Sequence, residues 1–535
     1  MKYGINESFD GDAFFPIFNH SQSINLEKKI FSNKNKEWEA MQKVAELTAK
    51  ELMQDFKELR PIPDNLSIVV LTGKGKNGGD SLCICDYIIR KMPRARISVF
   101  LHCERTQLNP LAEKALLRIE EKVKIYNCTK GINQSFLDSV IKTDFGASGI
   151  INLCIDGLLG LGFKPPLKET ISSSINQINL YSKIEMRASI DLPSGLSEES
   201  SQVYFNADFL YLSAIPKGAV FKGNARFGRV RFIDIGLMKR SDFNISEFQL
   251  NSYFINRSVL KYFSKFRTPQ SEKRVFGHLF IVGGSQHLPG ALLMSVKAAI
   301  QSGVGLVTAF APNSIVPVLA AEVPEAMWVP LPENNFGTLS QQAAEHILGQ
   351  AKSATALVIG PGLGRTIDTE FVVQQILQEA NLPLLLDADA LTPRVTEMIQ
   401  KGKTKSEDIT LTPHIGEFLR MTKLANISLE TQELLNIIKN IGATVVLKSG
   451  ITRISDGQDV YFNTHGGPVF SRGGSGDILA GIIGAQLANP NTDGLSASIL
   501  GVTLHGHAGE LLARERGQVM VRTTEVLDYL AEVIR

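Results

Sequence analysis

The sequence predicts an α/β protein with two doubly wound domains in tandem, and three observations support this prediction. Short apolar runs typical of strands alternate with helical patterns, which favours parallel sheets covered by helices on both faces. A length of 535 residues corresponds to roughly two to four domains of ordinary size. All five cysteines lie in the first 160 residues, whereas most of the 45 glycines follow residue 265, so the two halves differ in composition.

In the first half, a helical pattern of small and apolar residues begins at Glu37 and ends at Phe56. Two further helices are expected over 82–91 and 111–120. The strand-like runs are Ser67–Leu71, Ile97–Leu101, Ile150–Ile155, Ala188–Leu192 and Phe209–Leu212. We therefore expect an N-terminal extension over 1–35, an α/β domain over 36–238 and a charged linker over 239–265.

The same alternation resumes in the second half, which we expect to form one α/β domain over 266–535. A pair of short strands joined by an Asp-Gly turn predicts a hairpin, and the run 478–487 is apolar on all sides, which is typical of a buried central helix. The strand-like runs are His278–Val282, Gly305–Phe310, Ala356–Ile359, Leu384–Leu386, Ile409–Leu411, Val445–Leu447, Thr452–Ser455 and Asp459–Phe462.

Composition and charge exclude several classes of protein. Lys and Arg total 56 against 54 Asp and Glu, the formal net charge is +2, and 44% of the residues are hydrophobic. The net charge is too close to zero for a protein that wraps nucleic acid, and the hydrophobic fraction is too high for a disordered chain. We find no membrane-spanning run, signal peptide or paired CxxC cysteines, so we expect a cytoplasmic protein with buried, reduced thiols and no membrane partner.

A glycine-rich loop follows the first predicted strand. The residues Gly73-Lys-Gly-Lys-Asn-Gly-Gly-Asp80 precede a helical pattern, so backbone N–H groups and a helix start can face an anion. The spacing is neither a Walker A loop nor a strict GxGxxG pattern. A tight turn capped by Asn77 or Asp80 is the structural alternative.

Two other strand ends in this half carry acidic residues beside glycines. They read IDGLLGLG from Ile155 and DLPSG from Asp191. Because the carboxyl ends of parallel strands meet at one edge, these residues are expected to converge with the first loop. Asn77, Asp156 and Ser194 offer oxygen ligands for a cation, and Asp191 is a candidate general base; turn formation is the alternative for each Asp.

The sharpest pattern in the second half is Arg472-Gly-Gly-Ser-Gly-Asp477 at the start of the predicted buried helix. The N–H groups of Gly474, Ser475 and Gly476 can form an anion hole for a transferring phosphoryl group, and Asp477 can accept a proton from an attacking hydroxyl. The alternative is an Asp that only stabilises the first turn of the helix.

Three other polar groups have structural alternatives as well. His414 in TPHIGE is interpreted either as a ligand contact or as part of a helix cap. Asp387 and Asp389 in LDADAL end a predicted strand, where turn formation is the default role.

The first half resembles the N-terminal domain of NAD(P)H-hydrate epimerases through KGKNGGD, IDGLLGLG, DLPSGL and PKGAVFKGNARFGRVRFIDIG. The resemblance implies a Rossmann-like domain in which Asp191 is the acid/base and potassium is bound by Asn77, Asp156 and Ser194. It also implies that the hydrated nicotinamide nucleotide contacts Asn77, Gly78, Gly79, Asp80, Gly160, Leu161 and Gly162. The sequence departs from the family at Lys76, at Ser81 and after Gly195.

The second half resembles the ADP/ATP-dependent NAD(P)H-hydrate dehydratases, with GGSQHLPGA, GPGLG, LDADAL, LTPHIGE, VLKSG and GGSGD in the family order. The resemblance implies a ribokinase-like fold and catalysis by Asp477. Substrate contacts are implied for Ala291, Gly364, His414 and Asp477. Adenine-nucleotide contacts are implied for Lys448, Ser449, Gly450, Ile451, Thr452, Gly474, Ser475 and Gly476.

We therefore expect a bifunctional repair enzyme for hydrated NADH and NADPH. Its expected cofactors are potassium and magnesium, with ADP or ATP as co-substrate, and we expect a homo-oligomer. Two alternatives remain open from the sequence. One is a small-molecule kinase of the ribokinase-like group, and the other is a first half that serves only as a non-catalytic module.

Overall fold

The computed structural model describes residue 9 and residues 12–31, 33–146, 149–197, 203–222, 227–237 and 250–535. The chain divides into two compact units. The N-terminal unit is Phe15–Leu250, and the C-terminal unit combines Met1–Phe14 with Asn251–Arg535. Both are α/β structures, as the alternating pattern predicts.

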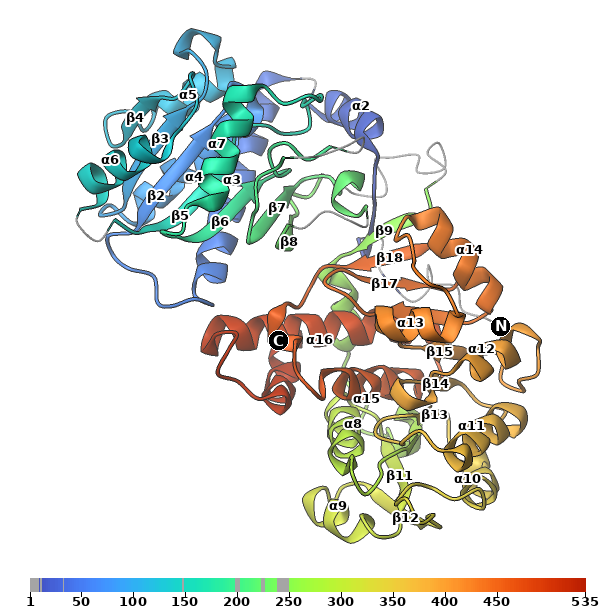
Figure 1. The fold of residues 1–535 in the computed structure, drawn as a ribbon. Helices are drawn as coiled ribbons and strands as arrows, with labels where there is room; N and C mark the ends of the chain where they lie inside the picture. Colours follow the sequence, from blue (N-terminus) through green and yellow to red (C-terminus); the bar gives the residue numbers. More distant parts are fainter. Residues whose placement is uncertain are drawn as a thin grey trace. The chain divides into compact units, whose positions relative to one another are not determined.

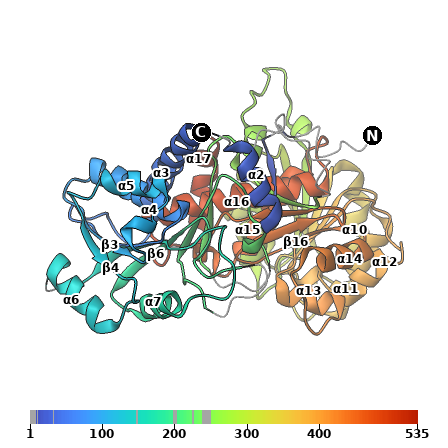
Figure 2. The same ribbon diagram turned by 90° about the horizontal axis from the view of Figure 1, so that it is seen from above.

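The N-terminal unit is built on a seven-stranded, entirely parallel sheet in the order β4-β3-β2-β5-β6-β7-β8. Helices α3, α4 and α5 cover one face and α6 and α7 the other (Figure 2). The strands are β2 (Ser67–Thr72), β3 (Arg96–Leu101), β4 (Lys124–Asn127), β5 (Ile151–Gly157), β6 (Ile184–Ile190), β7 (Phe209–Ser213) and β8 (Arg229–Ile233). The helices are α2 (His20–Ile30), α3 (Lys34–Phe56), α4 (Lys76–Lys91), α5 (Pro110–Leu117), α6 (Gln134–Phe145) and α7 (Glu169–Leu180).

The sheet of the C-terminal unit has eleven strands in the order β1-β9-β18-β17-β16-β15-β14-β13-β10-β11-β12, and its edge strand β1 includes the unit boundary after Phe14. Strand β17 pairs antiparallel with β16 and β18, which confirms the expected hairpin, whereas the pairs from β16 to β12 are parallel. The strands are β1 (Phe14–Pro16), β9 (Ser252–Ile255), β10 (His278–Val282), β11 (Leu306–Pro312), β12 (Met327–Leu331), β13 (Ala356–Ile359), β14 (Leu384–Leu386), β15 (Ile409–Leu411), β16 (Thr444–Leu447), β17 (Thr452–Ser455) and β18 (Val460–Asn463).

Helices lie on both faces of this sheet, with α8, α15 and α16 on one side and α10 to α14 on the other (Figure 1). Helix α15 packs against both α8 and α16 and is buried along its length, as its apolar sequence predicts. The helices are α8 (Pro289–Gln301), α9 (Val316–Glu322), α10 (Ala343–Gln350), α11 (Ile367–Glu379), α12 (Pro393–Gln400), α13 (Ile415–Thr422), α14 (Thr431–Ile441), α15 (Ser475–Leu487), α16 (Gly494–Arg516) and α17 (Leu530–Ile534).

The structure differs from the expected elements at several points. The strand expected over Ala188–Leu192 is β6, Ile184–Ile190, and the chain turns at Asp191, which has a φ of +67°. Helix α2 lies within the segment expected to be an extension. Residues 239–249 of the expected linker lie outside the described residues, and strand β9 occupies 252–255.

All five cysteines are buried and free, in agreement with the expectation of reduced thiols. Within the described residues, no helix combines the length and apolar character that a membrane crossing requires.

Candidate active sites

A cavity of about 640 Å³ lies in the N-terminal unit at the carboxyl ends of β2, β5 and β6. Its lining includes six residues expected to act in this half, namely Asn77, Asp80, Gly160, Leu161, Gly162 and Asp191. Two of the expected contact residues, Gly78 and Gly79, are buried in the first turn of α4 and are not among its lining residues. A Cβ atom at Gly78 would lie 2.1 Å from the Gly73 carbonyl oxygen, so close packing requires glycine there.

The carboxylate of Asp191 is held by the last residue of β7 and by a lysine four residues after it. Lys217 Nζ donates a hydrogen bond to Asp191 Oδ1 at 2.5 Å, and Ser213 Oγ donates to the same oxygen at 3.0 Å. The other oxygen, Oδ2, lies 3.5 Å from the position that a Cβ atom at Gly160 would occupy. Asp191 therefore has one oxygen fixed by a buried ammonium and the other beside the glycine loop of the cavity.

The expected cation ligands lie beside this cavity, where Asn77 and Ser194 both form hydrogen bonds with the Leu159 backbone. Asp156 is fully buried and accepts hydrogen bonds from Ser194 Oγ (2.6 Å), the Ser194 backbone N–H (2.8 Å) and Ser189 Oγ (2.9 Å). Burial raises the pKa of Asp156, and the bonds from Ser194 oppose the rise. Asn77 Nδ2 donates to the Leu159 carbonyl at 2.7 Å, while Asn77 Oδ1 is buried without a hydrogen-bond partner among the described residues.

Helix α2 supplies part of the cavity wall that the sequence reasoning missed. Ile24, Glu27, Lys28 and Phe31 line the cavity from this side. Burial raises the pKa of Glu27, and the Lys217 ammonium opposes the rise. The available signal was Asn19 followed three residues later by Gln22, which together form a capping box at the start of α2.

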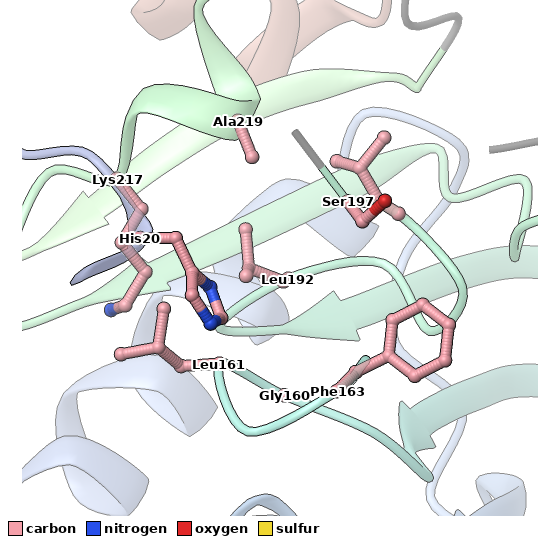
Figure 3. A pocket seen from close by; sticks show the side chains of 9 residues that line it. His20, Gly160, Leu161, Phe163, Leu192, Ser197, Lys217 and Ala219 are labelled. Carbon is pink, nitrogen blue, oxygen red and sulfur yellow. The ribbon is translucent and has the colours of Figure 1, made fainter. Parts of the chain in front are cut away.

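A second, smaller pocket of about 20 Å³ adjoins the same glycine loop and shares Gly160, Leu161 and Phe163 with the large cavity. His20 and Lys217 lie toward one side of it, and Phe163 and Ser197 toward the other (Figure 3). Lys217 therefore contacts Asp191 and also lines this second pocket.

In the C-terminal unit, Asp477 lies in the first turn of α15, after Gly474, which has a φ of +89°. Ser295 Oγ donates to the Asp477 carbonyl at 2.7 Å and so ties this turn to α8. Burial raises the pKa of Asp477 to about 6; the Asp387 carboxylate adds to the rise, and the Lys448 ammonium opposes it.

Lys448 follows β16, and its side chain lies close to both the end of β14 and the start of α15. Its Nζ donates to Asp387 Oδ1 at 2.9 Å and lies 3.3 Å from the position that a Cβ atom at Gly476 would occupy. Thr412 Oγ1 donates to the same Asp387 oxygen at 2.7 Å. Burial lowers the pKa of Lys448, but the carboxylates of Asp387 and Glu417 outweigh burial, and the net shift is upward.

The other expected residues of this half lie on neighbouring turns. Asp389 Oδ2 accepts a hydrogen bond from the Gly364 backbone N–H at 3.0 Å. The Cβ position of Gly362 lies 2.9 Å from Ala291 Cβ, so the loop that carries Gly364 adjoins the start of α8. The turn Ser449–Ile451 leads into β17, and Gly450 is exposed with no atom close to its Cβ position.

His414 caps a helix in the structure, which was the second of its two interpretations from the sequence. It is the N-cap of α13, and its Nδ1 accepts hydrogen bonds from the backbone N–H groups of Gly416 (3.0 Å) and Glu417 (3.3 Å). Its ring is also 59% exposed, and the backbone N–H of Lys448 donates to the Pro413 carbonyl at 2.9 Å. The exposed ring therefore lies next to the Lys448 strand end.

Sequence reasoning did not assign Asp387 a role in this site. The acid-x-acid spacing of LDADAL was the available signal, but turn formation was the default interpretation. In the structure, Asp387 pairs with Lys448 and Asp389 holds the Gly364 loop.

Comparisons with known proteins agree with this two-unit arrangement. Residues 39–218 match the family model described as YjeF-related protein N-terminus, and residues 279–532 match the model for NAD(P)H-hydrate dehydratase. The bifunctional NAD(P)H-hydrate repair enzyme of Moorella thermoacetica is 32% identical over 487 residues, covering 88% of each chain. That of Coxiella burnetii is 27% identical over 532 residues, covering 97% of this chain and 99% of that protein.

One solved structure matches about half of the chain. The ADP/ATP-dependent NAD(P)H-hydrate dehydratase from Bacillus subtilis, co-crystallised with ATP and Mg²⁺, is 28% identical with a TM-score of 0.42. The match covers 50% of this chain and 92% of that one. On the extent and identity of the full-length relatives, the chain belongs to the family of bifunctional NAD(P)H-hydrate repair enzymes.

Proposed function

We propose that the N-terminal unit interconverts the R and S hydrates of NADH and NADPH and that the C-terminal unit dehydrates the S hydrate at the expense of ADP or ATP. One observation carries the proposal for the C-terminal unit. The Asp477 carboxyl, with its pKa raised to about 6, lies at a glycine-bounded helix start beside the Lys448–Asp387 pair. A proton acceptor and an anion-binding helix start therefore occur together.

In the proposed dehydration, Asp477 takes the proton of the ring hydroxyl as that oxygen attacks the terminal phosphorus of the nucleotide. The new O–P bond forms as the bond to the AMP or ADP leaving group breaks. The ring C–O bond then breaks, phosphate leaves, and loss of a proton from the neighbouring carbon restores the double bond. The backbone N–H groups of Ser475 and Gly476 lie at the helix start, where they can stabilise charge on the transferring group.

Magnesium and nucleotide binding are part of this proposal. Asp387 and Asp389 are carboxylates close to Asp477. Carboxylates of this kind bind Mg²⁺ together with substrate phosphates. When bound, the ion would supply positive charge to the phosphate oxygens. Lys448 would contact the phosphates, and the open Ser449–Ile451 turn would hold the rest of the nucleotide.

In the proposed epimerisation, Asp191 moves the proton that allows the hydroxyl-bearing carbon to change configuration. The Lys217 ammonium holds Asp191 Oδ1, so Asp191 Oδ2, which lies by Gly160, is the oxygen left for the substrate. The 640 Å³ cavity provides space for the hydrated ring beside this oxygen.

The N-terminal unit also fits a potassium ion. Asn77 Oδ1 is a buried oxygen without a partner among the described residues, and Asp156 and Ser194 add two oxygens of the same hard type. These three residues would hold the ion, which would supply positive charge beside the substrate phosphates.

The test of the proposed function is a coupled assay with the full-length chain. Incubation with the S hydrate of NADH, Mg²⁺ and ADP or ATP is expected to restore the NADH absorption band with release of one phosphate per NADH. Accumulation of a phosphorylated hydrate without NADH would show a kinase instead. Supplying only the R hydrate, under conditions where spontaneous epimerisation is slow, tests the N-terminal unit separately.

A further inference from the structure

A second cluster of polar side chains lies in the C-terminal unit, outside the residues assigned above. His465 lies in the connection between β18 and α15, and His507 and Glu510 lie three residues apart on α16, so both project from one face of that helix. The potential ligand atoms of the three residues all lie within 4.8 Å of one another. Among the described residues, this is the cluster whose side chains are grouped closely enough to hold a metal ion.

The separations within the cluster match those between ligands of one small metal ion. His465 Nδ1 and His507 Nδ1 each lie 3.5 Å from Glu510 Oε2, which is longer than an ordinary hydrogen bond. In a tetrahedral site with bonds of about 2.0–2.1 Å, neighbouring ligand atoms stand about 3.3–3.4 Å apart. Two imidazoles and one carboxylate are also a ligand set that suits zinc.

The cluster contains buried nitrogen atoms that the protein leaves unsatisfied. Among the described residues, both ring nitrogens of His465 and the Nε2 atom of His507 make no hydrogen bond. The two side chains are 12% and 11% exposed. Buried polar atoms normally have a partner, and a neutral imidazole presents a lone pair that can bind a metal ion.

The β18–α15 connection, which carries His465, packs closely against α16. The Gly466 backbone N–H donates to Glu510 Oε1 at 3.0 Å, which orients the carboxylate so that Oε2 faces the histidines. A Cβ atom at Gly506 would lie 2.8 Å from the His465 carbonyl oxygen, so the backbones are in close contact there. The two rings lie 3.7 Å apart at an angle of 31°, and ion binding requires a ring to turn toward the shared oxygen.

We propose that His465, His507 and Glu510 bind one zinc ion that fastens the β18–α15 connection to α16. The three residues would leave one coordination position for water. The connection continues into Arg472–Asp477, so the ion would restrain the chain segment that leads to Asp477. The Gly466 N–H bond to the second carboxylate oxygen would orient Glu510 in the bound state as well.

The direct test is metal binding by the full-length protein after removal of bound metals with a chelator. Zn²⁺ or Co²⁺ is titrated in the presence of excess Mg²⁺, which fills sites built only from oxygen ligands. We expect about one ion per chain by elemental analysis, and visible Co²⁺ absorption bands of the intensity that four-coordinate sites give. His465→Asn and His507→Gln should each weaken Zn²⁺ binding at least tenfold, whereas His346→Gln, an exposed histidine on α10, should leave it unchanged.

A stability measurement distinguishes loss of the site from loss of the fold. Zinc should raise the unfolding temperature of the wild-type chain and of His346→Gln, but not that of His465→Asn. Circular dichroism and retained ADP binding establish that His465→Asn is folded. The proposal is wrong if the wild-type chain binds no zinc in the micromolar range, or if folded His465→Asn and His507→Gln bind Zn²⁺ with the wild-type stoichiometry and affinity.

Discussion

The Lys448 ammonium donates a hydrogen bond to the Asp387 carboxylate at 2.9 Å across the end of β15, the strand that separates the two strands preceding these residues. The same ammonium lies against Gly476 at the start of α15. Lys448 is therefore the positive charge that offsets part of the effect of burial on Asp477. The protonation of Asp477 therefore depends on Lys448, which lies 29 positions earlier in the chain.

Asp477→Asn should remove the proton acceptor of the C-terminal unit. We expect dehydration to slow by about 10²–10⁴-fold, the usual contribution of a general base. In the wild-type chain the rate should rise with pH through about 6, because Asp477 must be deprotonated to accept a proton. The rate of NADH recovery as a function of pH measures both effects, and a variant that keeps the wild-type rate would contradict the assignment.

Lys448→Gln should move the pH dependence of dehydration to higher pH. The Lys448 ammonium lowers the pKa of Asp477, so its removal raises that pKa further above about 6. The substitution also leaves the buried Asp387 carboxylate without its ion-pair partner, which should cost about 3–5 kcal/mol of unfolding free energy. Lys405→Gln, at an exposed position, is the matched control, and an unchanged pH midpoint in Lys448→Gln would count against the coupling.

Asp191→Asn and Lys217→Met should each slow epimerisation strongly and leave dehydration of the S hydrate intact. Asn keeps the size of Asp191 but removes its charge, and Met removes the ammonium that fixes Asp191 Oδ1. We expect a fall of about 10²-fold or more in consumption of the R hydrate. Equal consumption of the R hydrate by the wild type and both variants would show that the N-terminal unit is not catalytic.

Replacing potassium by a bulky organic cation should slow epimerisation. Asn77→Leu, which keeps the branched shape and the number of side-chain heavy atoms but has no oxygen, should slow it to the same extent and remove the dependence on potassium. The physical reason is that Asn77 Oδ1 is a buried oxygen in need of a partner. Initial rates measured at several potassium concentrations provide the test, and potassium dependence that persists in Asn77→Leu would exclude this ligand.

Glu27→Gln should reduce kcat/KM for epimerisation by about tenfold, because a charge interaction near a protein surface is worth on the order of 1 kcal/mol or more. Glu27 lines the cavity and interacts electrostatically with Lys217 and Asp191. Asn25→Ala, at an exposed position on the same helix, is the control. Equal kcat/KM values for the two variants would show that α2 only closes the cavity.

Hydrophobic periodicity predicts most strands and helices of both units. It does not predict the roles of residues that depend on partners distant in the sequence. The expected strands at 278–282, 356–359, 384–386 and 409–411 are found at those residues, because each is a short buried apolar run between turns. Helix α2 was missed because its buried residues, Ser23 and Leu26, form no long apolar stripe. Asp387 was missed because its partner Lys448 lies on another strand end, and no local pattern predicts that pair.

Gly360→Ala should destabilise the C-terminal unit strongly. Gly360 has a φ of +130°, and a Cβ atom there would lie 1.8 Å from the Asp387 carbonyl oxygen, so both backbone conformation and close packing require glycine. Gly402→Ala is the matched control, because Gly402 also has a positive φ (+61°) but no atom close to its Cβ position. We expect the control to cost about 1 kcal/mol from the backbone alone and Gly360→Ala to cost several times more. Thermal unfolding followed by calorimetry compares the two, and equal losses would show that the chain segment at Asp387 can move to accommodate a side chain.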